Sequence, residues 1–343
     1  MLSVDEYVIP PGSLILVTGV NGYIASHTVD ILLSLGYKVR GTVRAAKPWL
    51  DKYFDDKYGK GRFESVIVTA LDDPAAWTKG TLTNVAGLCH IASDLSFSPD
   101  PATVIPWVKQ STISLLGAAA REKSVKRFVL TSSSSAALLP VPNAEGVRVD
   151  ENTWNEASVK KAWDDSTPPL ERRFHTYAAA KAEQEQAAWR FVKEQHPGFD
   201  LNVVVPNCNY GRILLPEITG SSMGMLRNML KGDATAMRLL SPQWFVNVED
   251  TARLHALALL NPTVKGERIF AFACPFNWND IIPILRKLRP ENRLIPNPPE
   301  NEGRDLSEIV HSKRAEGLLR DFFGQPSWIC LEQSIAEGLG DMP

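Results

Sequence analysis

Tyr177 and Lys181, in the segment TYAAAK, have the side-chain types and the spacing that proton transfer needs. They are four positions apart in a segment that we predict to be helical, so their side chains share a face and can meet. An unperturbed tyrosine has a pKa of about 10, too high for ready proton exchange at neutral pH. A neighbouring ammonium favours the phenolate and lowers that pKa. Tyr177 can then protonate a carbonyl oxygen while hydride reaches the carbon.

A run of four serines, in LTSSSSA, follows a strand-like stretch upstream of Tyr177. A serine hydroxyl at this strand end can donate a second hydrogen bond to the same oxygen and hold it as charge develops. A tyrosine and a lysine at this spacing also occur by chance in many helices. The pair becomes informative here because a glycine-rich loop and the serine run precede it.

The glycine-rich loop reads TGVNGYIASH at residues 18–27, directly after the apolar run SLILV. Gly19 allows a tight turn, Gly22 a close approach of the backbone to a phosphate, and Ala25 close packing of helix on strand. Free N–H groups and the helix dipole then favour the negative charge. An accidental turn would look the same in isolation, but the strand–turn–helix context favours dinucleotide binding.

The end of the second predicted strand, YKVRGTVR, indicates which dinucleotide binds. NAD sites usually carry an acidic residue there for the ribose 2′-hydroxyl, whereas arginine suits a 2′-phosphate. This strand offers Arg40 and Arg44, and no carboxylate stands within it or between it and Asp51. Arginine can hold a phosphate with two parallel N–H donors. Two surface arginines would give the same pattern; we favour NADPH as the cofactor.

The elements that must position these residues alternate between strand and helix through the first half of the chain. Short apolar strands are predicted at 13–19, 37–44, 63–70, 87–93, 126–133 and 201–207, with helices near 21–36, 102–122 and 172–194. This alternation predicts an α/β fold with a doubly wound parallel sheet (Rossmann), covered on both faces. Ligands bind such a sheet beyond the carboxyl ends of its strands.

Beyond Pro206 the pattern loosens, which predicts a smaller C-terminal substrate-binding lobe. We expect residues 1–205 to form the NADP-binding domain, with 245–262 returning to it as a strand and a helix. The lobe then comprises 206–244 and 263–343, and 267–273 is a further strand candidate.

The composition is that of an ordinary globular protein. The 343 residues are 44% hydrophobic and 22% charged, with a net charge of −2, so no overall positive field favours nucleic acid or an anionic membrane. Four scattered cysteines without a CxxC pair suit a reducing compartment, and the dispersed histidines predict no metal site. We expect a cytoplasmic protein without a secretion signal or a membrane span.

Seven stretches between positions 14 and 250 together resemble one family. They are LVTGVNGYIASH, GYKVRGTVR, GLCHIASDLSFS, SVKRFVLTSSSSA, YAAAKAEQEQAAW, VVVPN and SPQWFVNVED. The chain resembles an extended short-chain dehydrogenase/reductase of the dihydroflavonol and cinnamoyl-CoA reductase branch. Within that branch it is most similar to fungal NADPH-dependent aldehyde and carbonyl reductases (ketoreductases).

The resemblance implies a catalytic set of Ser133, Tyr177 and Lys181, with Ser134 as the second choice for the serine. Lys181 would also bond the nicotinamide ribose, and Arg44 the 2′-phosphate. The cofactor-binding residues implied are Thr18, Gly19, Asn21, Gly22, Tyr23, Ile24, Arg44, Leu71, Asp72, Ile91, Ala92, Ser93, Thr131, Lys181 and Pro206. The substrate-binding residues expected are Asp94, Phe97, Ser133, Tyr177, Asn207, Leu240, Gln243 and Trp244. Met223, Met225, Leu226 and Phe245 are further candidates for an apolar pocket, with core packing as the alternative.

Three features depart from the family pattern. Ala70 stands near the place of an acid that holds the adenine amino group, which leaves Asp72 as the candidate. Asp94 replaces an apolar or small residue of the substrate cleft, where it either favours a cationic or hydroxylated substrate or faces water. The motif of the cinnamoyl-CoA reductases before Tyr177 is absent, since the chain reads FHTYAAAK, and this weighs against a CoA thioester.

The resulting hypothesis is NADPH-dependent reduction of aldehydes, ketones or keto esters to alcohols, by a monomer or homodimer. One alternative is an NAD-dependent sugar-nucleotide epimerase or dehydratase of the same family, which the strand-end arginine disfavours. Another is a non-catalytic dinucleotide sensor on the same fold, which the Tyr177–Lys181 pair disfavours.

Overall fold

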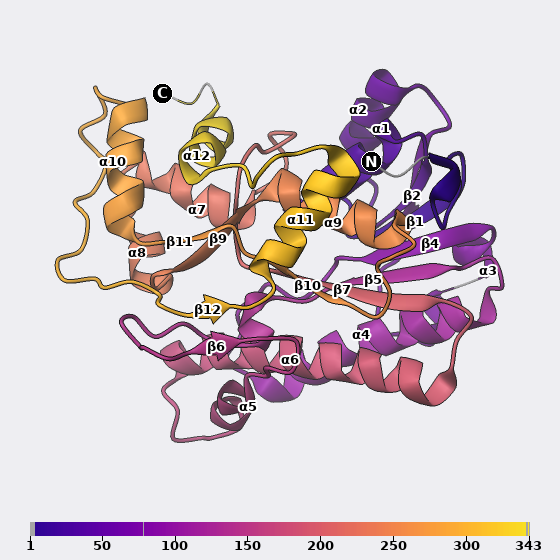
Figure 1. The fold of residues 1–343 in the computed structure, drawn as a ribbon, viewed down its shortest axis with the longest axis horizontal. Helices are drawn as coiled ribbons and strands as arrows, with labels where there is room; N and C mark the ends of the chain where they lie inside the picture. The colour runs from indigo at the N-terminus through magenta and orange to yellow at the C-terminus, as the bar shows by residue number, and fades with distance from the viewer. Residues whose placement is uncertain (1–3, 78, 341, 343) are drawn as a thin grey trace.

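A parallel sheet of seven strands forms the centre of the computed structural model, which describes residues 4–77, 79–340 and 342 (Figure 1). The strand order is β10-β7-β5-β4-β1-β2-β3, and every neighbouring pair is parallel. The strands are β1 (Leu14–Thr18), β2 (Lys38–Val43), β3 (Phe63–Ile67), β4 (Val85–His90), β5 (Arg127–Thr131), β7 (Asp200–Pro206) and β10 (Arg268–Ala271). The predicted doubly wound parallel α/β sheet is therefore confirmed.

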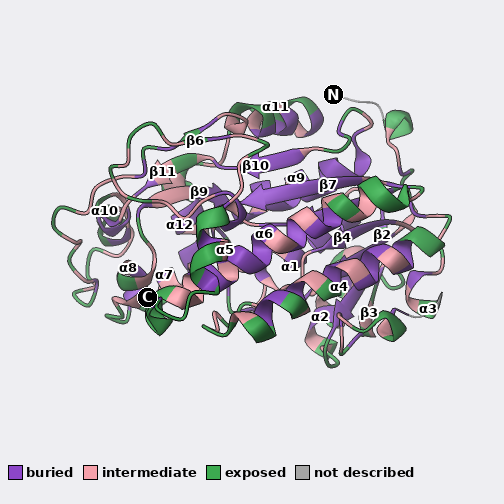
Figure 2. Ribbon diagram, turned by 90° about the horizontal axis from the view of Figure 1, so that it is seen from below, coloured by how far each residue is buried: buried purple, intermediate pink, exposed green. Residues whose placement is uncertain are grey.

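Helices cover both faces of this sheet (Figures 1 and 2). Alternate residues of β1 explain why: Ile15 and Val17 enter one buried cluster and Leu16 enters the other, because successive side chains of a strand point to opposite faces. One face carries α4 (Pro101–Arg121) and α6 (Pro169–Gln195), and the other α1 (Tyr23–Ser34), α9 (Val248–Leu260) and α11 (Ser312–Phe323). Shorter elements are α2 (Pro48–Tyr58), α3 (Lys79–Leu82) and α5 (Glu156–Ala162), with single 3-10 turns at Val4–Glu6, Pro74–Ala76 and Ser134–Ala136.

The second lobe is built on a three-stranded sheet in the order β11-β9-β8. Its elements are β8 (Cys208–Tyr210), α7 (Ser221–Met229), α8 (Thr235–Leu239), β9 (Gln243–Asn247), β11 (Cys274–Phe276), α10 (Trp278–Leu288) and α12 (Leu331–Leu339). A separate apolar cluster that includes Tyr210, Phe276 and Trp278 forms its core.

Two segments expected in the second lobe lie instead with the first domain. Strand β10 pairs with β7 at the edge of the main sheet, and α11 packs on α9 and β10. The expected division at residue 263 missed this because a returning edge strand has no local signal that distinguishes it from a lobe strand. The two parts are also joined by a short ladder between β6 (Arg148–Val149) and β12 (Glu308–Ile309).

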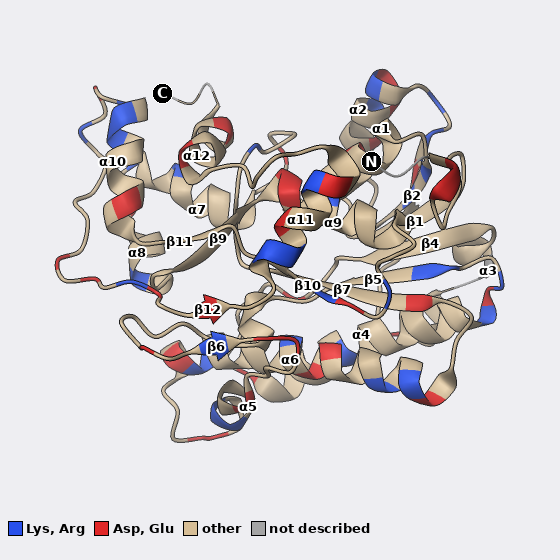
Figure 3. Ribbon diagram, in the orientation of Figure 1, with Lys and Arg blue, Asp and Glu red and all other residues tan. Residues whose placement is uncertain are grey.

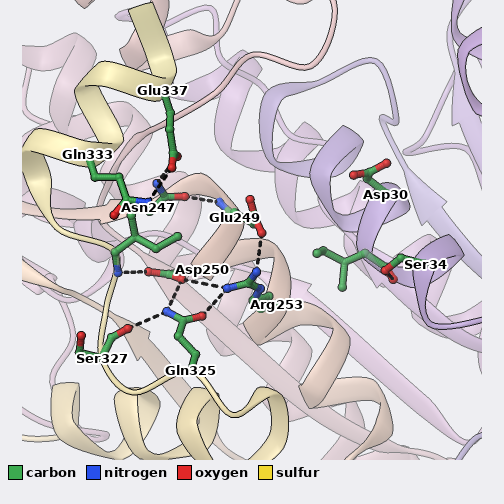
Figure 4. A network of polar contacts seen from close by, with 12 residues as sticks. Asp30, Ser34, Asn247, Glu249, Asp250, Arg253, Gln325, Ser327, Gln333 and Glu337 are labelled. Atoms are coloured by element: carbon green, nitrogen blue, oxygen red, sulfur yellow. Dashed lines mark hydrogen bonds and ion pairs between the residues drawn. The ribbon is translucent and has the colours of Figure 1, made fainter. Parts of the chain in front are cut away.

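A polar network ties the C-terminal segment to the start of α9 (Figure 4). The buried carboxylate of Asp250 accepts hydrogen bonds from the Ile329 amide at 2.9 Å and from Gln325 Nε2 at 2.7 Å. Arg253 donates to Gln325 and, at 2.5 Å, to Glu249. Burial raises the pKa of Asp250 to about 6, so this link between chain segments depends on pH.

Charges of both signs are interspersed over the surface, for example along α6 and α10 (Figure 3). Within the described part of the chain, no helix is both long and apolar enough to cross a bilayer.

Candidate active site

Helix α6 brings Lys181 to the carboxyl end of β5. The Lys181 ammonium is buried and donates to the Thr131 carbonyl at 3.1 Å and to Gln184 Oε1 at 3.2 Å. Burial lowers the pKa of Lys181 to about 8, while the carboxylate of Glu185 acts in the opposite direction. The Lys181 ammonium therefore loses its proton as the pH rises through about 8.

Tyr177 lies one turn before Lys181 and is half-buried. Burial raises its pKa above the usual value of tyrosine, and a hydrogen bond with Ser133 lowers it. This differs from the expectation that the Lys181 ammonium lowers the pKa, because desolvation of the phenolate dominates. A phenol that keeps its proton at neutral pH is suited to donating it.

The serines of the run make different contacts. The Ser132 hydroxyl donates to Glu185 Oε2 at 2.6 Å. Ser133 Oγ accepts the Ser135 hydroxyl at 2.9 Å and the Ser135 amide at 3.3 Å. Because two donors occupy its lone pairs, the Ser133 proton is left to bond Tyr177 or a ligand. Ser133, rather than Ser134, is thus the serine beside Tyr177.

The glycine loop has the backbone that close approach of a ligand requires. Gly19 has a φ of +69°, and a Cβ there would lie 3.0 Å from the Ala92 Cβ. Its amide is held by Thr42 of β2, a contact that the sequence did not indicate. Gly22 precedes α1 without a side-chain cap, so the first amides of this helix are not blocked by a side chain.

Thr18 joins the ends of β1 and β4. Its hydroxyl oxygen accepts the amides of Ile91 at 2.9 Å and Ala92 at 3.0 Å and lies 3.0 Å from His90 Nδ1. Segment 91–93 therefore lies beside the glycine loop. Burial lowers the pKa of His90 to about 3, so this ring is neutral. The Thr18 hydroxyl is used within the protein, which leaves backbone groups to face a cofactor.

Two other expected cofactor residues also use their side chains internally. The Tyr23 hydroxyl donates to the Gly211 carbonyl at 2.7 Å, so its ring packs into the second lobe. Thr131 Oγ1 lies 2.7 Å from His255 Nε2. Asn21 and Ile24 are half-buried at the start of α1, and Pro206 ends β7.

The two strand-end arginines differ in their surroundings. Arg40 pairs with Glu64 at 2.6 Å and donates to the carbonyls of Gly80 and Thr81. Arg44 is exposed directly after β2 and has no hydrogen bond or ion pair with any described residue. Arg44 is therefore the one whose guanidinium stays available.

Leu71 and Asp72, both predicted to contact the cofactor, lie in the segment after β3. Leu71 is buried, and its carbonyl accepts Trp77 Nε1 at 2.9 Å. Asp72 is half-buried and its carboxylate bonds none of the described residues, whereas Asp73 caps the following 3-10 turn. Asp72 is thus the carboxylate that remains available at this strand end.

An aromatic wall lies against Tyr177. The Phe97 ring centroid is 4.9 Å from that of Tyr177 and 6.0 Å from that of Phe174. Phe97 has a φ of +50°, a conformation that costs energy in a bulky residue and is typical of functional sites. Asp94 is held locally, since it accepts the Ser96 amide and hydroxyl at 2.9 and 2.6 Å. The sequence did not single out Phe174.

The remaining substrate candidates make hydrogen bonds with residues other than Tyr177. Asn207 accepts the Cys208 amide, Gln243 donates to the Ser241 carbonyl, and Trp244 donates to Ser307. The Leu240 carbonyl accepts Trp278 Nε1. None of these contacts joins them to Tyr177. The apolar candidates Met223, Leu226 and Phe245 are fully buried in the lobe core, so they pack the lobe instead of lining a pocket.

The sequence profile of the NAD dependent epimerase/dehydratase family matches residues 15–271. The chain belongs to this family. It is an NAD(P)-dependent oxidoreductase of the extended short-chain dehydrogenase/reductase group. Ketoreductase nvfG of Aspergillus novofumigatus is 43% identical over 97% of this chain and 98% of its own length. Aldehyde reductase 2 of Sporidiobolus salmonicolor is 40% identical over 99% of each chain.

Two solved reductase structures have the same fold as this chain. The yeast methylglyoxal/isovaleraldehyde reductase Gre2, solved with NADPH, has a TM-score of 0.77 at 21% identity. Gre2 of Candida albicans, also solved with NADPH, has a TM-score of 0.79 at 24% identity. In both comparisons 95% of this chain is covered, with 96% of the yeast chain and 97% of the Candida chain.

The residues present fit the nicotinamide dinucleotide that the family uses. The start of α1 has no side-chain cap, so its first amides are free to bind a pyrophosphate, and a Cβ at Gly19 would press against Ala92. Ser93 Oγ is buried beside this loop without a hydrogen-bond partner among the described residues. Such an orphaned group is satisfied by a polar ligand. Within the same residues, no cluster of histidine, cysteine and carboxylate side chains could hold a metal ion.

Proposed function

We propose that the protein is an NADPH-dependent carbonyl reductase that converts aldehydes, ketones or keto esters to alcohols. The observation that carries the proposal is the surroundings of the Tyr177 hydroxyl. Ser133 bonds it, buried Lys181 lies one helical turn away, and the Phe97 ring packs against the Tyr177 ring. A proton donor, an oxygen-binding donor and an apolar wall are together what reduction of a carbonyl requires.

The chain's own residues supply binding, orientation and the proton. NADPH, when bound, supplies the hydride. Ser133 holds the carbonyl oxygen with its free hydroxyl proton, and Tyr177 transfers its phenolic proton to that oxygen. Lys181, charged below a pKa of about 8, stabilises the phenolate that remains and bonds the nicotinamide ribose.

The preference for NADPH over NADH rests on Arg44. Its guanidinium is unengaged at the end of β2, and half-buried Lys47 follows at the start of α2. No carboxylate lies between them and β2 to bind a ribose 2′-hydroxyl. Two cations at this place favour a 2′-phosphate.

The aromatic wall and the names of similar proteins support the proposed substrate class. Phe97 and Phe174 favour aromatic or aliphatic substituents over the hydroxyl-rich groups of a sugar nucleotide. Similar proteins carry the names ketoreductase and aldehyde reductase. We further propose that the enzyme acts in the cytoplasm as a monomer or homodimer.

The residues of the site favour neither of the two alternatives. A sugar-nucleotide epimerase with NAD would be served by an acid at the end of β2, where Arg44 stands. A non-catalytic sensor would not need the hydrogen bond between Ser133 and Tyr177.

The test is oxidation of NADPH against an aromatic aldehyde, a β-keto ester, an aryl ketone and a dihydroflavonol, with NADH in parallel. We expect turnover with NADPH that Tyr177→Phe abolishes. Tyr53→Phe, which removes a hydroxyl from α2, is the matched control and retains activity. Turnover that survives in Tyr177→Phe, or no turnover on any substrate, would overturn the proposal.

A further inference from the structure

A buried ion pair lies directly behind the serine run, outside the groups that would touch substrate. Arg268 Nε donates to Glu185 Oε1 at 2.7 Å, and the two side chains are 4% and 0% exposed. Trp189 Nε1 donates to the same oxygen at 3.2 Å. The other oxygen accepts the Ser132 hydroxyl at 2.6 Å and Arg268 Nη2 at 3.3 Å. Four donors therefore satisfy both oxygens of the carboxylate.

The ion pair belongs to a ring of contacts that closes around the serine turn. Arg268 Nη1 donates to the carbonyls of Glu151 and Thr153, and its guanidinium lies 4.0 Å from the centre of the Trp154 ring. The next residue, Asn155, donates to the carbonyls of Ser135 and Ala136. The turn is thus held from one side through Ser132 and from the other through Ser135.

Helix α6 uses a single face for three contacts with this turn. Tyr177, Lys181 and Glu185 follow one another at intervals of four residues, so they lie on one face of the helix. They contact Ser133, the Thr131 carbonyl and the Ser132 hydroxyl, respectively. Ser133 is the next residue along the chain and is in the extended conformation. Holding the Ser132 side chain on Glu185 therefore restricts the backbone that carries the Ser133 hydroxyl.

We propose that Glu185 and Arg268 are positioning residues, which act through Ser132 to hold the Ser133 hydroxyl against Tyr177. This inference rests on the proposed carbonyl reduction. Stability alone does not account for the pair, because replacing a buried ion pair by apolar residues is often neutral or stabilising. A fully bonded carboxylate does fix one orientation of the groups around it, which an apolar contact does not.

The test compares Glu185→Gln, Ser132→Ala and the control Glu183→Gln. Glu183 is on the same helix and lies 3.9 Å from Lys109, away from the serine turn. We expect kcat to fall by up to about 100-fold in both test variants, the cost of a misplacement on the order of 1 Å. The KM for NADPH and the activity of the control stay unchanged.

The pH profile separates positioning from a general loss of structure. The Glu185 carboxylate raises the pKa of Lys181, so Glu185→Gln moves the alkaline limb of kcat to lower pH. Ser132→Ala keeps the ion pair and leaves that limb in place while kcat falls. A purely structural role would lower the folded fraction without moving the pH profile or the kcat of the molecules that remain folded.

Hydrogen exchange gives a readout that needs no turnover. In both test variants, the amides of residues 132–137 exchange faster while those of β7 and β10 do not. If the wild-type protein reduces no carbonyl substrate, the proposed function is refuted. The hydrogen-exchange comparison of the variants with wild type still tests the positioning role. Folded variants with wild-type kcat, pH profile and exchange at 132–137 would overturn the positioning role.

Discussion

Replacing Arg44 by glutamine tests the origin of cofactor preference. The Arg44 guanidinium is exposed and makes no ion pair within the described chain, so no internal contact is lost in Arg44→Gln. A hydrogen bond to a charged group contributes about 1.5–3 kcal/mol. Since 1.4 kcal/mol corresponds to a factor of ten, kcat/KM for NADPH should fall about 10- to 100-fold. NADH has no 2′-phosphate, and its kcat/KM should change little.

The assay measures kcat/KM for both cofactors at a saturating carbonyl concentration and at two salt concentrations. Salt screens exposed charges, so added salt should reduce the wild-type preference for NADPH and leave that of Arg44→Gln almost unchanged. Arg40→Gln is the matched control. Arg40 is engaged with Glu64 and with backbone carbonyls, so its loss should lower the melting temperature and preserve the cofactor ratio. An unchanged NADPH-to-NADH ratio in Arg44→Gln would refute the reasoning.

Three further changes have expected outcomes. Gly19→Ala places a methyl group 3.0 Å from the Ala92 Cβ at a φ of +69°. It should lower the free energy of unfolding by about 1–2 kcal/mol and weaken NADPH binding, measured by thermal melting and by fluorescence titration. A melting temperature and an NADPH affinity equal to those of wild type would contradict this. Because the pKa of Lys181 is about 8, kcat should fall as pH rises through about 8. Lys181→Met should lower kcat and remove this alkaline limb of the pH profile. An alkaline limb that persists in the variant belongs to another group. Burial raises the pKa of Asp250 to about 6, so the unfolded chain ionises first, and the contribution of Asp250 to the free energy of unfolding falls by about 3 kcal/mol between about pH 4 and 6. Urea titrations across this range should show that slope in wild type and not in Asp250→Ala.

Local patterns in the sequence were sufficient for the individual strands and for the helix with the candidate catalytic pair, but not for the place of β10 in the central sheet. Apolar runs and glycines predicted each strand of the central sheet within a few residues, because strand burial and turn chemistry act over short spans. The spacing of Tyr177 and Lys181 fixes their shared face, since it depends only on helical geometry. Helix α6 begins at Pro169, slightly earlier than the predicted 172, where proline suits the first turn.

Only the tertiary structure decided which contacts each of several identical residues makes. Four consecutive serines look alike in sequence, and Glu185, contributed by α6, engages Ser132 and so distinguishes it from Ser133. Arg40 and Arg44 differ because Glu64 of β3 lies beside one of them. Strand β10 joined the main sheet and carried Arg268 to Glu185, more than eighty residues away along the chain. Contacts between distant segments follow no periodicity, because they depend on how whole elements pack, and they become visible only in the folded chain.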